Sequence, residues 1–110
     1  MSVFRKIRNA VGNITAYPDI APKSPPSEYI VYNFSLISGE AFGDDLATEE
    51  VSGVQVHYFV PIGTNYLATM EELKQNFINE GFTHPRIYPY VEEDINKVHI
   101  VFDMEIEMEA

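Results

Sequence analysis

The stretch KVHIVFDMEIEME, residues 97–109, decides the fold. Apolar residues occupy every second position from Val98 to Met108, and most positions between them are polar or acidic. Successive side chains of a strand point to opposite faces of a sheet, so this period of two predicts a strand with one buried face. The other face is expected to be wet and increasingly acidic toward the end of the stretch. We therefore expect a sheet that is covered on one side only.

The residues before this strand predict a hairpin partner for it. Residues 86–91 (RIYPYV) read as a strand, and residues 93–96 (EDIN) turn the chain. Proline has no backbone N–H to donate, so Pro89 demands an edge strand or a position without a hydrogen bond.

A long helix is predicted ahead of the hairpin. Its apolar side chains recur at i, i+4, i+7 and i+11 and form one stripe: Tyr66, Met70, Leu73 and Phe77. Thr64 or Asn65 is expected to cap its start, and Thr69 with Glu72 suggests an inner capping box. Glycine readily adopts the left-handed conformation that ends many helices, so Gly81 predicts the stop, and the phenylalanine after it folds back onto the last turn.

Two further strands are predicted in the first half of the chain. Residues 28–36 and 50–60 are rich in β-branched and aromatic types, and Gly53 in the second suggests a bulge. In that strand four apolar side chains share one face, and the other face holds Gln55, His57 and Phe59. Ser38-Gly39 predicts a turn, while residues 40–48 fit either a weak edge strand or a loop.

The N-terminal quarter predicts a helix and an arm. Residues 2–12 have apolar residues at helical spacing, with Ser2 as a cap and Gly12 as a stop. Residues 13–27 contain four prolines, so this stretch is neither regular helix nor central strand. Its apolar side chains suggest an extended arm that packs on its own domain or on a neighbour.

The order of elements predicts an α+β fold: an antiparallel or mixed sheet of about four to five strands, with two helices packed on one face. A chain of 110 residues fits a single domain. Within it, residues 1–12 form the N-terminal helix, residues 13–27 the arm, and residues 28–110 the sheet and main helix.

The charge is high and unevenly placed. The net charge is −10, yet residues 1–27 carry four bases against one acid, and residues 28–110 carry three bases against sixteen acids. So acidic a body repels phosphate backbones, which argues against ordinary nucleic-acid binding. With no cysteine, no signal-peptide core and no apolar run of membrane-spanning length, we expect a protein made in a reducing cytoplasm and not inserted in a membrane.

No motif indicates an enzyme, a metal or a cofactor. The three histidines, His57, His84 and His99, lack the spacing of a metal site, and ordinary sheet positions are the favoured interpretation. The paired carboxylates fall in turns and on exposed faces, where solvated charge is expected. Nucleophile elbows and phosphate-binding glycine loops are absent from the sequence. We therefore expect binding or assembly, with no catalytic residue.

Several segments together resemble small proteins from the tail-gene modules of phages and prophages of Gram-positive bacteria. They are residues 25–34 (PPSEYIVYNF), 55–61 (QVHYFVP), 64–67 (TNYL), 79–83 (NEGFT) and 98–107 (VHIVFDMEIE). The resemblance to this tail-terminator, or tail-completion, family extends over roughly residues 14–108. Its motifs are hydrophobic patterns with a helix cap, and none is a catalytic signature.

The resemblance implies an α+β virion protein that forms a ring, a hexamer in the similar proteins, on the head-proximal end of the tail tube. Such a ring ends tube polymerisation and offers the surface for joining the head. The implied partners are other copies, the tail tube protein and a head-completion or neck protein, with DNA passing through the ring without sequence-specific binding. The protein would reside in the host cytoplasm during assembly and then in the tail.

Residues suited to a subunit interface or a lumen wall follow from the charges of the acidic strand and the basic helix and from the apolar side chains of the arm. The candidates are Asp103, Glu105, Glu107, Tyr17, Ile20, Arg5 and Arg8. Two alternatives stay open: a head-completion or neck adaptor, and an acidic DNA mimic that inhibits a DNA-binding protein.

Overall fold

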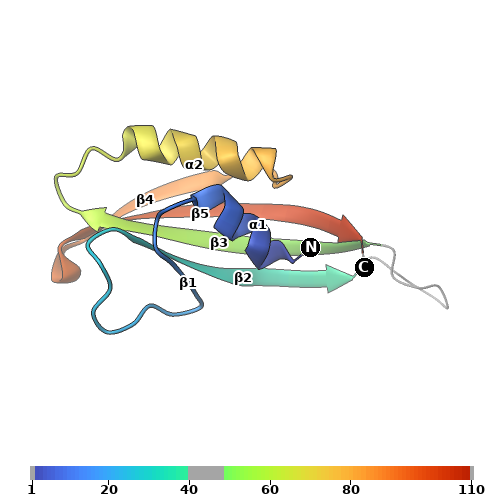
Figure 1. Ribbon diagram of the computed structural model, residues 1–110, viewed down its shortest axis with the longest axis horizontal. Coiled ribbons are helices and arrows are strands. Elements are labelled where there is room, and N and C mark those ends of the chain that lie inside the picture. Colours follow the sequence, from blue (N-terminus) through green and yellow to red (C-terminus); the bar gives the residue numbers. More distant parts are fainter. Residues whose placement is uncertain (1, 40–48, 110) are drawn as a thin grey trace.

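A computed structural model describes residues 2–39 and 49–109 of the chain. It has an α+β architecture with a five-stranded mixed sheet and two α-helices, as predicted (Figure 1). In chain order the elements are α1 (Val3–Val11), β1 (Ala16–Pro18), β2 (Tyr29–Gly39), β3 (Glu49–Pro61), α2 (Leu67–Asn79), β4 (Arg86–Glu92), a 3₁₀ turn (Glu93–Ile95) and β5 (Lys97–Glu109).

The sheet has the strand order β1-β2-β3-β5-β4. Its centre is the antiparallel pair of β3 and β5, which stays in register from Glu49 opposite Glu109 to Pro61 opposite Lys97. The short strand β1 runs parallel to β2, which makes the sheet mixed. Strand β4 lies at the other edge of the sheet, which is the position predicted for a strand that contains Pro89.

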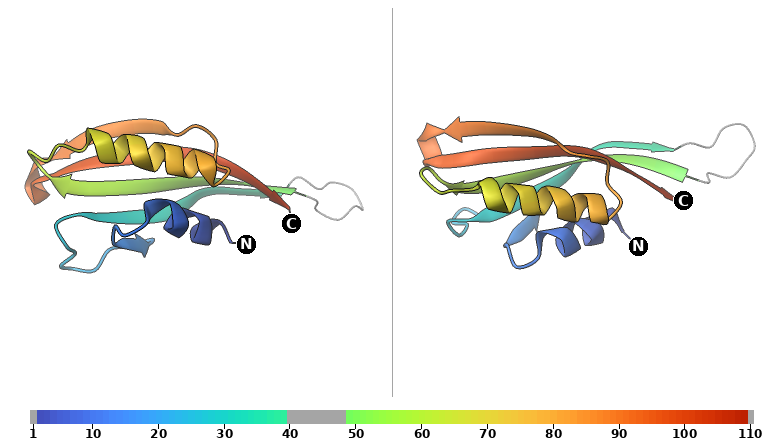
Figure 2. Two further views of the ribbon diagram at one scale, coloured as in Figure 1. Left: turned by 45° about the horizontal axis from the view of Figure 1, so that its top comes forward. Right: turned by 90° about the horizontal axis from the view of Figure 1, so that it is seen from above.

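Both helices cover the same face of the sheet (Figure 2). Residues that are fully buried there come from both layers: Ile7, Ile30, Val54, Val56, Phe77, Ile100 and Phe102. The helices also touch each other, because the Asn76 side-chain amide donates to the carbonyl of Ala10 at 3.0 Å and Lys6 donates to the carbonyl of Glu80 at 3.2 Å. In the described ranges, neither helix has the length and apolar character needed to cross a membrane.

Three of the four helix ends match the sequence signals. The hydroxyl of Ser2 accepts the N–H of Arg5 at 3.1 Å, and Gly12 ends α1 with a φ of 63°. At the end of α2, Gly81 has a φ of 102°, and the N–H of Phe82 returns to the carbonyl of Phe77 at 3.1 Å. Together with the bond from the N–H of Gly81 to the carbonyl of Ile78 at 3.0 Å, this is a Schellman motif.

The start of α2 differs from the prediction. The helix begins at Leu67, so Thr69 lies inside it and the capping box of Thr69 with Glu72 is wrong. Tyr66 occupies the N-cap position and makes no side-chain cap bond, while the side-chain oxygen of Asn65, one of the two predicted caps, accepts the N–H of Leu67 at 3.4 Å. A threonine inside the helix does not cap it, because the N–H three residues further on donates to a helical carbonyl.

Strand β2 runs further than expected. Ser38 and Gly39 pair with Val51 and Glu50, so the predicted turn is wrong. The long partner strand offers hydrogen bonds to these residues, and this pairing overrides their local preference for a turn. The bulge suggested by Gly53 lies opposite it, where the register shifts between Phe34 and Leu36. The segment 40–48 lies outside the described residues.

Candidate functional site

The face of the sheet turned away from the helices carries a row of aromatic rings. One ring comes from each strand, in sheet order: Tyr17, Tyr29, Phe59, His99 and Tyr90. The neighbouring ring centroids are 6.5, 4.7, 4.3 and 5.9 Å apart. From Tyr29 onward the rings are direct cross-strand partners, so the strand register itself builds the row. We call these five residues the aromatic row and this side of the sheet the open face.

His99 of the aromatic row also belongs to a series of three hydrogen-bonded side chains, together with His57 and Glu92. Nδ1 of His57 lies 2.7 Å from Nε2 of His99, and Nδ1 of His99 lies 3.0 Å from a carboxylate oxygen of Glu92. The carboxylate can only accept, so Nδ1–H of His99 donates to it, and Nε2 of His99 is left to accept the Nδ1–H of His57. Burial, followed by the nearby ring of His99, lowers the pKa of His57, while Glu92 opposes that shift. Burial also raises the pKa of Tyr29.

The three hydrogen-bonded side chains of His57, His99 and Glu92 do not form a metal centre. His99 uses its two ring nitrogens in opposite directions, so the three side chains run in a line and do not converge on one point. Within residues 2–39 and 49–109, no group of three potential ligands is placed to hold a metal ion.

A hollow of about 370 Å³ lies beside the aromatic row. Its floor is formed by the open face of β2 and β3, and its rim by residues 19–21 of the proline-rich arm. The N–H of Ile20 donates to the carbonyl of Pro18 at 2.7 Å, and Asp19 between them has a φ of 66°. This tight turn leaves the side chain of Ile20 79% exposed. Tyr17 and Ile20 therefore both belong to the open face.

The acidic candidates continue the open face along β5. Asp103 is half-buried, and Glu105 and Glu107 are exposed. We call these three residues the acidic row. The expectation that this whole side of β5 is wet is wrong at Val101, which is only 7% exposed because His57 and Tyr88 flank it on the adjacent strands.

The basic candidates lie on the opposite side of the sheet. Arg5 and Arg8 are exposed on α1, and Arg8 donates to the hydroxyl of Tyr32 at 3.3 Å. The seven residues singled out from the sequence are therefore divided between two faces. The structure brings Tyr17, Ile20 and the acidic row onto one face and leaves the two arginines on the other.

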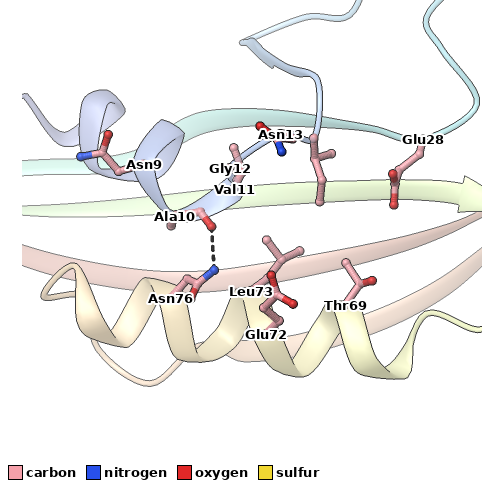
Figure 3. Close-up of a pocket in the computed structure, with 11 residues that line it drawn as sticks. Asn9, Ala10, Val11, Gly12, Asn13, Glu28, Thr69, Glu72, Leu73 and Asn76 are labelled. Carbon is pink, nitrogen blue, oxygen red and sulfur yellow. Dashed lines mark hydrogen bonds between the residues drawn. The ribbon is translucent and has the colours of Figure 1, made fainter.

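A second cavity, of about 460 Å³, lies between the end of α1 and the first half of α2 (Figure 3). Its lining is mostly polar and includes Asn9, Asn13, Glu72 and Thr69. Glu28, also in the lining, accepts a short hydrogen bond from the hydroxyl of the buried Tyr58, and burial together with this bond raises the pKa of Tyr58. Asn76 and Ala10 also line the cavity, and the bond between them ties the two helices together there.

Sequence reasoning found the acidic row but missed the aromatic row. The alternation along the strands does contain a signal for the aromatic row. It places Phe59 and His57 on the face opposite the core, and Tyr29 and Tyr90 also occupy strand positions that point away from the core. What was lacking was the register between strands, which decides whether such rings meet or lie apart.

No protein-family model matches the chain, and no curated protein matches it in sequence. Solved structures that share its fold include two that match nearly the whole chain. One is a chain of the virion of a native gene transfer agent particle, with a TM-score of 0.57 and 11% identity, covering 99% of this chain and 92% of that one. The other, which carries no functional description, has a TM-score of 0.56 and 14% identity, covering 100% of this chain and 87% of that one.

Proposed function

We propose that this chain is a structural protein of a phage-like virion. It forms a ring on the head-proximal end of the tail tube, ends tube polymerisation and provides the surface to which the head is joined. The observation that supports this proposal is the likeness to a chain of a gene transfer agent virion, which extends over 99% of this chain and 92% of that one.

The surface of the molecule fits assembly better than catalysis. Half of the exposed large apolar residues in the described part of the chain lie on the open face or at the sheet edges, where a neighbouring protein can cover them: Ile20, Leu36, Tyr88, Tyr90 and Val91. The partners in this proposal are other copies in a ring of six, the tail tube protein and a neck protein. A net charge of −10 lets DNA pass such a ring without binding to it.

Deleting the gene from the genome that encodes this chain tests the proposal. Negative-stain electron microscopy of the resulting particles should show tails of abnormal length lying apart from DNA-filled heads. Supplying the chain from a plasmid should restore joined particles of uniform tail length. This complementation is the control for effects on neighbouring genes.

Other outcomes of the same experiment assign other functions. Tails of normal length beside heads that lose their DNA would place the protein in the neck as a completion adaptor. Normal, infectious particles would exclude a structural role and favour an acidic mimic of DNA, whose binding to its target weakens with salt.

A further inference from the structure

We propose that α1 of each copy docks on the open face of the next copy, at the acidic row. This inference rests on the proposed function, because it identifies the contact between neighbouring subunits of the ring. Arg5 and Arg8 on α1 would face Glu105 and Glu107 on β5. The occupant of this part of the open face is therefore a second copy of the same chain.

The charges on the two surfaces are complementary and unneutralised. Helix α1 carries three bases and no acid, and the acidic row carries three acids. Among the described residues, ion pairs link Lys74 with Glu71 and His99 with Glu92, and neither involves α1 or the acidic row. Complementary charge across an interface selects the partner and sets the orientation.

The two surfaces lie back to back on the same stretch of sheet. The ring of Phe4 in α1 stacks on that of Phe34 at 4.7 Å, and Phe34 is in register with Val54 and then Met104 across the sheet. The acidic residues on either side of Met104 point to the opposite face. In Figure 1, the first turn of α1 and the end of β5 accordingly lie at the same end of the molecule.

This arrangement allows the contact to repeat. A copy that is displaced across the sheet brings its acidic row onto α1 of the copy behind it, and its own α1 remains free for the next. Such a head-to-tail contact is heterologous, so it generates a closed ring when the rotation between copies closes.

The segment beside the acidic row limits where the helix can lie. Strand β4 begins at Arg86, which pairs with Asp103, and Thr83 ahead of it lies beside Glu105: its N–H donates to the carbonyl of Glu105 at 2.8 Å, and its hydroxyl accepts the N–H of Glu105 at 2.9 Å. The helix would therefore lie over the open face of β5, above the side chains of Glu105 and Glu107, and not against the sheet edge.

Engineered disulfides test this contact directly, because the natural chain has no cysteine. Asn9 is exposed on α1 and follows Arg8, so the double variant Asn9→Cys with Glu107→Cys should cross-link neighbouring copies in assembled particles. These two positions lie on opposite sides of one sheet and cannot bridge within a chain. A non-reducing gel should show a ladder that ends at the size of the ring. Asn9→Cys with Glu93→Cys, at the far end of the sheet, is the control and should give monomer.

Charge exchange is the second test. Arg5→Glu with Arg8→Glu should lower the amount of the chain in particles by at least about tenfold, and so should Glu105→Lys with Glu107→Lys. Combining all four changes should restore incorporation, which a misfolded protein would not. Lys23→Glu with Lys74→Glu makes the same change in net charge as the two arginine substitutions, but outside both surfaces, and should leave incorporation unchanged.

The outcomes separate this inference from the proposed function. Particles that contain the double-cysteine variant at the normal level but yield only monomer on the gel would overturn the docking of α1 while leaving the virion role intact. Four exchanged charges that fail to restore incorporation would also overturn it. Absence of the unaltered chain from particles would remove the proposed function, and the inference with it.

Discussion

Nδ1 of His57 and Nε2 of His99 lie 2.7 Å apart across strands β3 and β5, close enough for one proton to be shared between the two rings. If both of these nitrogens carried a proton, the two N–H groups would point at each other and the hydrogen bond would be lost. Glu92 faces this pair from the end of β4, and Asp19 lies on the rim of the same hollow as His57. Burial and the adjacent ring of His99 disfavour the protonated form of His57 and lower its pKa, while Glu92 opposes that shift.

The stability of the fold should fall on mild acidification through His57. Its pKa is lowered in the folded protein, so the unfolded chain binds the proton more readily, and stability is lost as the pH falls through the ordinary value of about 6.5 toward the folded value. His57→Gln should flatten this loss. Urea unfolding between about pH 7.5 and 5.5 measures it. Coincident pH profiles for the two proteins would contradict the role of His57, and His84→Gln, which removes an exposed histidine, is the control.

Gly81→Val should lower the free energy of unfolding by about 1–3 kcal/mol. The cost comes from the backbone, because Gly81 has a φ of 102° and the space is open, the nearest side-chain atom to an added Cβ being one of Ile106 at 3.7 Å. Glu80→Val, one position earlier where φ is −81°, should cost markedly less. Equal losses in thermal or urea unfolding would show that the Schellman turn does not require glycine.

Gly53→Ala should destabilise the bulge by about 1 kcal/mol. An added Cβ would lie 2.8 Å from the hydroxyl oxygen of Ser35 and 3.2 Å from Cβ of Leu36. Removing the hydroxyl should therefore recover part of the loss, so Ser35→Ala with Gly53→Ala should be more stable than the sum of the single changes predicts. A double-mutant cycle by urea unfolding measures this coupling. Strict additivity would mean that the strand shifts as a whole.

Tyr58→Phe should cost about 1 kcal/mol, because it removes the hydrogen bond to Glu28 while leaving the ring in the core. Tyr88→Phe, at an exposed position of β4, should change stability by less than about 0.5 kcal/mol. The loss should be accompanied by faster proteolysis of the arm that precedes Glu28, since this bond ties the arm to β3. Unchanged proteolysis would show that other contacts hold the arm, such as the bond that Lys97 donates to the carbonyl of Ser27 at 2.6 Å.

The fold was predictable wherever the local sequence pattern agreed with the pairing and packing that the rest of the chain imposes. The alternation in β5, the glycine stop at Gly81 and the edge position of Pro89 each follow from backbone geometry that no tertiary context reverses. The turn at Ser38-Gly39 failed because a partner strand was present to pair with it. Local preference decides a structure only where no such partner competes.

The candidate site was predictable in part. The acidic row follows from the period of two in one strand, so its residues had to share a face. Predicting the aromatic row requires the register of all five strands. One of them, β1, is a parallel edge strand of three residues that cannot be recognised from composition. The burial of Val101 has the same origin, because its neighbours come from two other strands.

The ladder between β3 and β5 also sets how this molecule responds to load. Thirteen residue pairs join the two strands, whereas three join β1 to β2. A force along the long axis of the molecule, which extends over 53 Å, would shear all rungs of the central ladder at once. A force that lifts β1 from its edge would open its rungs one after another. The N-terminal segment would therefore yield long before the centre of the sheet, and the central pair would transmit tension from one end of the molecule to the other.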